Sequence, residues 1–191
     1  TARYGFAPWD GGAVRIYAMS GHADDTPALL PSDPTRTGWV RNQGGFRFDQ
    51  TASGDAVVLQ GDLFDDTTPA MVGENGRGFN LSGSWSHPFE TGSSLQVQAY
   101  KDENSRILPG LAREQLDTYD LQIQHDTGLW WNDTFIWGLE NRYSKEAFYS
   151  SSVFGFADPV TNSNISNLFF QDEFKLLDKL KVTTGIKVEN S

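Results

Sequence analysis

Hydrophobic and polar side chains alternate with a period of two residues along most of this chain. In the segment 79–86, Phe79, Leu81 and Trp85 alternate with asparagine and serine. Successive side chains of a β-strand point to opposite faces, whereas a helix repeats every 3.6 residues. The segment therefore predicts a strand with one apolar face and one hydrated face, and the chain as a whole reads as all-β.

The same alternation predicts about ten strands, a number within the usual range for a sheet or a barrel. They are centred on residues 3–7, 14–18, 40–49, 57–63, 79–86, 95–100, 119–124, 134–143, 168–176 and 182–189. Ile136, Val58 and Phe64 break the alternation, because each places an apolar side chain among polar ones.

The connections between these strands alternate between short and long. Short turns are expected at 8–12, 51–55, 89–94, 128–133 and 177–179, and longer polar loops at 23–37, 65–77, 103–115 and 146–164. Outer-membrane barrels have this asymmetry, with short turns at one edge and long loops at the other. The predicted fold class is therefore all-β, an antiparallel up-and-down meander of about ten strands that forms part of a transmembrane β-barrel.

Aromatic residues gather near the predicted strand ends, where they could form the interfacial girdles of a membrane barrel. They are Tyr4, Trp9, Trp39, Phe48, Trp85, Phe89, Trp130, Trp131, Tyr143 and Phe174. Aromatic side chains that cap the turns of a soluble barrel are the alternative, because a soluble antiparallel sheet also has one wet face and one dry face.

Composition removes several classes of function. The 191 residues carry 25 acidic and 15 basic side chains, a net charge of −10, which argues against a nucleic-acid partner. Without cysteine the chain has no disulfide framework, no thiolate zinc site and no cysteine nucleophile. No apolar run approaches 18 residues and no signal peptide is expected at Thr1.

Particular segments resemble TonB-dependent outer-membrane receptors. Segments 13–18, 43–49 and 59–62 are similar to early barrel strands, and 117–125 and 137–143 to central strands. Phe170-Gln171-Asp172-Glu173-Phe174, followed by Leu180 and 184–187, resembles a recurrent strand pair of that family. Such receptors close a 22-stranded barrel around an N-terminal plug, so residues 1–191 are expected to be a single barrel segment without a plug domain.

The resemblance implies a function in transport rather than catalysis. The parent receptor would take up a scarce solute actively, such as a ferric siderophore or cobalamin, in the outer membrane of a Gram-negative bacterium. The implied partners are outer-membrane lipid, a plug domain and TonB through the parent receptor, and an unknown small-molecule ligand. No cofactor is expected.

Charged residues on the hydrated faces of the strands are expected to face a lumen, where they would contact a plug or one another, because charge on a lipid face is costly. They are Arg15, Arg41, Arg47, Asp49, Asp62, Asp120, Glu140, Arg142, Glu173 and Lys187. Four aromatic residues in the serine-rich loop 146–164 are candidates for ligand binding: Phe148, Tyr149, Phe154 and Phe156.

Catalytic and metal sites are not predicted. His125 and Asp126 are neighbours on one strand and point to opposite faces, and no Gly-x-Ser-x-Gly elbow is present. Asp24, Asp25, Asp65 and Asp66 could supply oxygen ligands to Ca²⁺, but a solvated acidic loop is the favoured interpretation. Two alternatives stay open: a complete small outer-membrane barrel with a structural, adhesive or enzymatic role, and a soluble β-barrel or sandwich that binds a ligand.

Overall fold

Ten strands make up the computed structural model, which describes residues 1–26, 37–68, 73–129, 133–150, 157–177 and 179–191. They are β1 (Ala2–Phe6), β2 (Gly12–Ala23), β3 (Trp39–Ala52), β4 (Asp55–Thr68), β5 (Glu74–Pro88), β6 (Ser94–Leu108), β7 (Ala112–Leu129), β8 (Asp133–Ser150), β9 (Val160–Leu177) and β10 (Leu180–Asn190). None of the described residues belongs to a helix that could cross a membrane.

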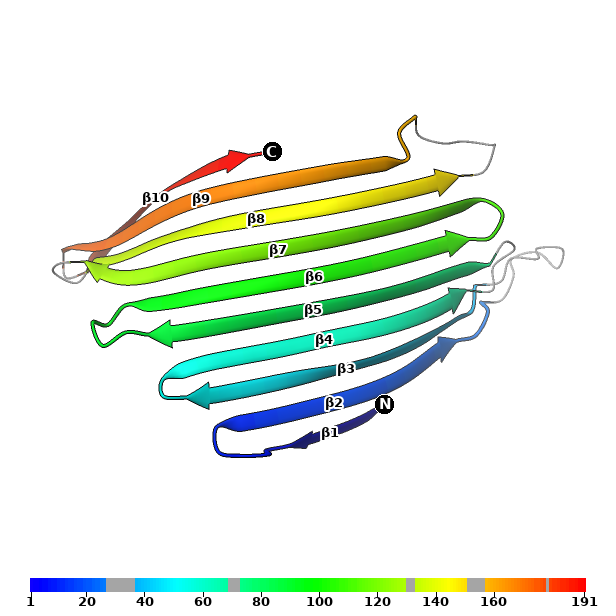
Figure 1. Ribbon diagram of the computed structural model, residues 1–191, viewed down its shortest axis with the longest axis horizontal. Coiled ribbons are helices and arrows are strands. Elements are labelled where there is room, and N and C mark those ends of the chain that lie inside the picture. The colour runs from blue at the N-terminus through cyan, green and yellow to red at the C-terminus, as the bar shows by residue number, and fades with distance from the viewer. Residues whose placement is uncertain (27–36, 69–72, 130–132, 151–156, 178) are drawn as a thin grey trace.

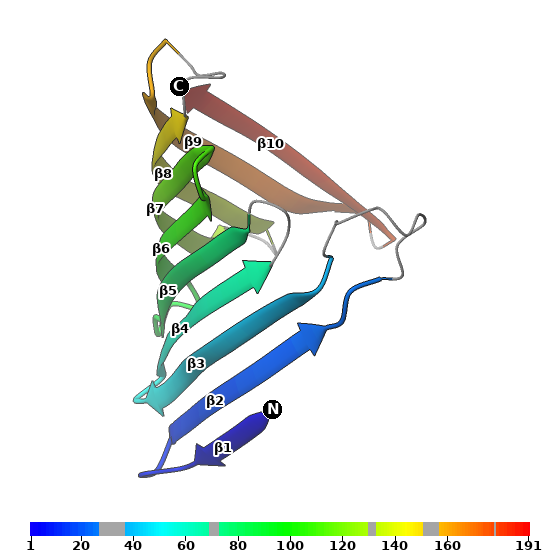
Figure 2. The same ribbon diagram turned by 90° about the vertical axis from the view of Figure 1, so that its right-hand side faces the viewer.

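Each strand pairs antiparallel with the next one in the chain, so the spatial order is the sequence order β1 to β10. The fold prediction is confirmed: the chain is an all-β meander. Figures 1 and 2 show a single strongly curved layer, with the two chain ends at opposite edges of the sheet. In the described part of the chain β1 pairs only with β2 and β10 only with β9, so the ten strands form an open sheet.

Two-residue and other tight turns join the strands at the edge where short turns were predicted. Between β3 and β4, Ser53 and Gly54 both have positive φ, of 53° and 90°. Positive φ at both central residues is the geometry that matches the right-handed twist of a hairpin. This turn therefore fixes the register in which Ala52 pairs with Asp55.

At the opposite edge the strands extend well into the regions predicted to be loops. β6 and β7 are separated only by residues 109–111, and β8 continues to Ser150 before β9 begins at Val160. The predicted loops 103–115 and 146–164 are therefore too long. Backbone pairing continues in these regions although the alternation in the sequence has ended: residues 102–106 of β6 are polar on both faces, and Phe148 and Tyr149 of β8 follow one another.

The apolar face of the sheet forms no conventional core. Among the described residues, Ala147 is the only buried hydrophobic one, whereas Leu121 is 48% exposed and Ile186 62% exposed. A soluble sandwich would need a second layer over this face, and the described residues supply none. The strand length fits a membrane instead: β5 presents apolar or aromatic side chains over the nine residues from Phe79 to His87, and a barrel strand needs about 9–11 residues to cross the hydrocarbon.

An aromatic belt lies across β5, β7 and β8 on the apolar face, at the edge of the short turns. His87 stacks on Trp85 and meets Phe89 edge-on, and Phe89 in turn contacts His125. The indole N–H of Trp137 donates to Nδ1 of His125 at 3.2 Å. Amphipathic rings gather in this way at the boundary between lipid and water. The belt contains Trp85 and Phe89, which the sequence had marked, whereas Trp130 and Trp131 lie outside the described residues.

Candidate functional site on the concave face

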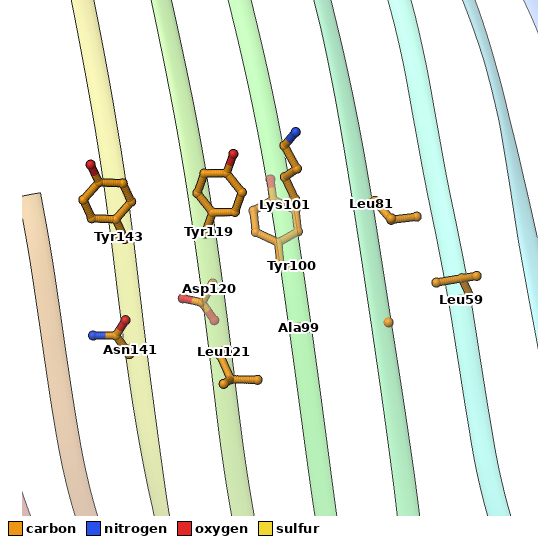
Figure 3. A pocket seen from close by; sticks show the side chains of 11 residues that line it. Leu59, Leu81, Ala99, Tyr100, Lys101, Tyr119, Asp120, Leu121, Asn141 and Tyr143 are labelled. Carbon is orange, nitrogen blue, oxygen red and sulfur yellow. The ribbon is translucent and has the colours of Figure 1, made fainter. Parts of the chain in front are cut away.

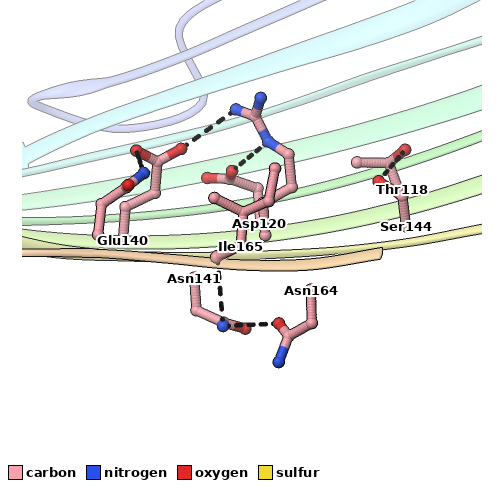
Figure 4. Close-up of polar contacts among 9 residues, drawn as sticks. Thr118, Asp120, Glu140, Asn141, Ser144, Asn164 and Ile165 are labelled. Atoms are coloured by element: carbon pink, nitrogen blue, oxygen red, sulfur yellow. Dashed lines mark hydrogen bonds and ion pairs between the residues drawn. The ribbon is translucent and has the colours of Figure 1, made fainter. Parts of the chain in front are cut away.

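Many of the polar side chains of the sheet lie on its concave face. Figure 4 shows Asp120 and Glu140 on the side toward which the sheet curves, and Asn141 and Asn164 on the opposite side. Cross-strand register places Arg15, Arg47, Gln60, Ser82, Tyr100, Asp120 and Arg142 in one row. Facing pairs in a sheet share a face. By the same register, all ten charged residues predicted to share the hydrated surface do share this face.

The densest polar cluster joins β7, β8 and β9. Arg142 donates from Nε to Asp120 at 2.9 Å and from its terminal nitrogen to Glu140 at 3.2 Å. Glu140 also accepts from the amide nitrogen of Asn167 at 3.1 Å. The side chain of Asp120 is only 10% exposed, so Arg142 supplies the charged partner that a shielded carboxylate requires. This cluster is drawn in Figure 4.

A second ion pair on this face involves β3 and β4. Arg47 makes a forked contact with Asp49, with distances of 2.6 to 3.0 Å, and donates to Gln60 on β4 at 2.9 Å. The flat guanidinium group suits this bidentate geometry. Three strands away from the Arg142 cluster, the same arrangement thus recurs: an arginine that bridges a carboxylate and a neighbouring strand.

Tyr17 links β2 to two further strands. Its hydroxyl group donates to Asp62 on β4 and accepts from the amide of Gln43 at 2.8 Å. The ring can cross β3 because Gly45 lies beneath it, where an added Cβ would come within 2.7 Å of the tyrosine ring. Asp62, one of the predicted residues, is therefore held by a hydroxyl donor rather than by a cation.

Near the loop edge, an aromatic ring interrupts the polar surface. Phe64 lies over Gly78 on the neighbouring strand, where an added Cβ would meet the ring at 2.3 Å. The guanidinium of Arg41 sits 4.1 Å from the ring centroid and 3.7 Å from Asp66. Cation–π contact of this kind holds an arginine over a ring while leaving its edge available. Phe64, which looked like an irregularity in the alternation, is therefore part of this site.

Arg106 and Glu74 were missed by the sequence reading because both fall in regions predicted to be loops. Arg106 on β6 makes a forked pair with Glu74 on β5, at 2.5 and 3.0 Å. The extension of both strands beyond the alternating segment brings these side chains together. The only signal in the sequence was that these two residues, 32 positions apart, carry opposite charges. That spacing does not predict a contact unless the register between β5 and β6 is known.

The four aromatic candidates for ligand binding do not form one group. Phe148 and Tyr149 belong to the end of β8, and cross-strand register puts Phe148 on the concave side with Glu114 and Tyr149 on the opposite face with Arg113. Tyr149 is 52% exposed. Phe154 and Phe156 lie outside the described residues. The prediction that these residues bind a ligand is not tested by this placement.

The chemistry available on the concave face is that of binding. Several of its cations pair with carboxylates in exposed or half-exposed pairs, such as Lys181 with Glu173 at 2.6 Å and Lys187 with Glu189 at 3.2 Å. Within the described ranges, no three histidine, aspartate or glutamate side chains are grouped closely enough to hold a metal ion. Half-exposed pairs of this kind can exchange partners with an incoming polar surface at little cost.

No family model and no curated protein matches the sequence. Solved structures do match. The siderophore receptor PirA from Acinetobacter baumannii superposes with a TM-score of 0.75 at 13% identity, over 98% of this chain and 35% of the receptor. A mutant of the ferric enterobactin receptor PfeA from Pseudomonas aeruginosa gives 0.74 at 14% identity, over 97% and 35%. The alcaligin outer-membrane receptor FauA from Bordetella pertussis gives 0.63 at 10% identity, over 98% and 35%.

The chain therefore spans about a third of the length of each of these receptors. The match covers nearly all of this chain, so the ten strands have the fold of part of an outer-membrane receptor barrel. The three proteins are named as a siderophore receptor, a ferric enterobactin receptor and an alcaligin outer-membrane receptor.

Proposed function

We propose that the chain is part of a TonB-dependent outer-membrane receptor that takes up a scarce solute actively, with a ferric siderophore as the first candidate. The observation that carries this proposal is the division of the sheet into an apolar convex face and a charged concave face, in the fold of a receptor barrel. A barrel in lipid requires this division, because its exterior meets hydrocarbon and its interior meets water.

The open edges of the sheet support the view that more strands complete the barrel. In the described structure, β1 and β10 each have one edge without a partner strand, and exposed edges of this length promote association. A complete ten-stranded barrel would instead pair β1 with β10. We infer that further strands of a longer protein cover both edges.

The concave face fits the role of a lumen wall that holds a plug. Its polar side chains are abundant, and its ion pairs remain half exposed, as expected of groups that meet another folded surface through polar contacts. Energy transfer would then come from TonB acting on that plug, without covalent chemistry on the barrel. The ten charged residues on this face are proposed to contact the plug or one another.

The ligand would meet the loop edge of the same face. Phe148 lies on the concave face at this edge, and cross-strand pairing places it in the same row across the sheet as Arg106 and Arg41. Aromatic and cationic groups together suit a bulky anionic chelate, because rings supply contact area and arginines supply charge. Phe154 and Phe156 are proposed to extend this surface, as the sequence suggested.

Transport assays with the complete gene product test the proposal. The protein would be expressed in Escherichia coli cells that lack their own siderophore receptors, with and without TonB, and supplied with ⁵⁵Fe bound to enterobactin or alcaligin. We expect accumulation of ⁵⁵Fe from at least one chelate only in the cells with TonB. Accumulation that is the same without TonB, or no accumulation of either chelate by correctly inserted protein, would contradict the proposal.

The residues at the loop edge can be tested in the same assay. Phe148→Ala is expected to raise the chelate concentration needed for half-maximal uptake. Tyr149→Ala removes a ring from the neighbouring residue, on the opposite face, and serves as the matched control. Equal effects of both variants on the half-maximal concentration would mean that Phe148 is not part of the ligand-binding surface.

A further inference from the structure

A shallow depression of about 510 Å³ lies on the convex face, over the middle of the sheet. Figure 3 shows it from the convex side, with the labelled Tyr100 and Asp120 behind the ribbon and the other labelled side chains in front. It crosses five strands, from Leu59 on β4 to Tyr143 on β8. Tyr100 and Asp120 also line it, although their side chains lie on the other side of the ribbon.

The floor of the depression is apolar and low. It consists of Gly83 on β5 and Ala99 on β6, which face each other in the register. Leu59 and Leu121 are the next residues in the same row, one on each side, and both project from the sheet with exposed fractions of 38% and 48%. Two small residues between two leucines form a furrow in the apolar surface.

The end nearer the loops is polar and positively charged. Lys101 follows Ala99 on the same face of β6, and its ammonium group lies 5.6 Å from the centroid of the Tyr119 ring and 5.8 Å from that of Phe79. Tyr143 on β8, which pairs with Tyr119, completes this end, whereas Asn141 lies in the row of Ala99 and Leu121. Rings on both sides hold the ammonium group in place by cation–π attraction.

The position of Lys101 needs an explanation, because charge on a lipid-facing surface is unfavourable unless it reaches the interface or finds a counter-charge. On β6 it is the first charged residue on this face after Leu95, Val97 and Ala99. Its nearest carboxylate is Glu103 at 3.6 Å, a long pair in which both side chains are exposed, 37% and 43%. An ammonium group has three donors, and one distant carboxylate does not satisfy them.

We propose that this depression binds a membrane lipid with a phosphate head group, with the phosphate on Lys101 and an acyl chain in the furrow over Gly83 and Ala99. The proposal rests on the proposed function, because it requires the convex face to meet lipid. The order of the features fits the orientation of a lipid in a leaflet: the cation lies nearer the polar loop edge and the apolar furrow runs toward the middle of the sheet. A phosphate provides acceptors that can approach the ammonium group of Lys101 more closely than the Glu103 carboxylate does at 3.6 Å.

Native mass spectrometry of the complete protein in mild detergent can measure this binding. Dioleoyl phosphatidylglycerol is the anionic probe, and dioleoyl phosphatidylcholine has the same chains with no net charge. We expect phosphatidylglycerol to bind more tightly than phosphatidylcholine. Lys101→Gln should lower the affinity for phosphatidylglycerol by about tenfold, the loss expected for one charged hydrogen bond. Phosphatidylcholine binding should barely change in this variant.

Two further variants separate the head group from the chain. Ala99→Leu fills the furrow without altering charge and should lower the affinities for both lipids by a similar factor. Lys145→Gln removes a lysine from the same face of β8, outside the depression, and should leave both lipids unaffected. Equal weakening by Lys101→Gln and Lys145→Gln, or no preference for the anionic lipid, would overturn the proposal.

Membrane insertion is measured separately, in membranes isolated from the expressing cells, by the resistance of the protein to extraction with alkaline carbonate. Protein that resists extraction but shows no effect of Lys101→Gln overturns only the lipid site. Protein that is extracted without detergent overturns the lipid site and the proposed function together.

Discussion

The convex and concave faces of the sheet are built from alternate residues of the same strands, yet they are stabilised in different ways. On the convex face large side chains such as Leu121 and Ile186 stay exposed and make few directed contacts. On the concave face Arg142, Asp120 and Glu140 bind one another through specific hydrogen bonds. One face therefore depends on the surrounding medium for its stability, whereas the other depends on its own partners. Substitutions that differ only in which face they alter test this contrast.

The largest effect is expected from a new charge at the centre of the convex face. Leu121→Arg should destabilise the folded protein in a lipid bilayer by about 2–4 kcal/mol, the cost of arginine near the bilayer midplane. Gln122→Arg, on the next residue and the concave face, is the control and should change stability little. Urea unfolding from lipid vesicles measures both, and equal costs would mean that the two faces do not differ in environment.

A smaller effect is expected from filling glycine positions. Gly78→Ala should cost about 1–2 kcal/mol, because its Cβ would meet the Phe64 ring at 2.3 Å and force that ring away from its place under Arg41. Gly83→Ala on the convex face is the matched control, since its Cβ would make an ordinary contact of 3.5 Å with Leu59. The same unfolding assay compares them, and a larger cost for Gly83→Ala would contradict the packing described for Phe64.

The smallest effect concerns ion pairs within the concave face. Arg142→Gln should cost about 1 kcal/mol, because it removes the cation that serves two carboxylates, one of them the shielded Asp120. Lys187→Gln removes a cation from a pair that is more than half exposed on both sides and should have less effect. If both variants lose the same stability, then the shielding of Asp120 contributes nothing.

Much of the fold was predictable because strand alternation is a local property. The alternation around Phe79, Leu81 and Trp85 predicted the strand and its two faces. Nine of the ten observed strands begin or end within a few residues of the segment that was expected for them. β7 is the exception, since it runs from Ala112 to Leu129 and was expected at 119–124. β9 ends where expected but begins at Val160, earlier than the expected start at Leu168. Its first residues, such as Thr161 and Asn162, are polar on both faces, so no alternation marks them.

The candidate sites were predictable only in part. Alternation identified Asp120, Glu140 and Arg142 as residues of one hydrated face, but it gave no information on which of them meet. Arg106 and Glu74 were missed because their strands continue beyond the apolar band, and Lys101 was missed because a single lysine in an apolar row looks like an irregularity. Phe148 and Tyr149 were expected in a loop, whereas β8 reaches both residues and turns them to opposite faces.

The sequence by itself determined that the chain is an antiparallel meander with an apolar face and a charged face, since both follow from a two-residue period and from short turn motifs such as Ser53-Gly54. Only the tertiary structure decided which face is convex, how far the strands extend, and which side chains from different strands come into contact. Those features depend on register and curvature, which accumulate over pairs of strands, and no single segment of the chain contains that information.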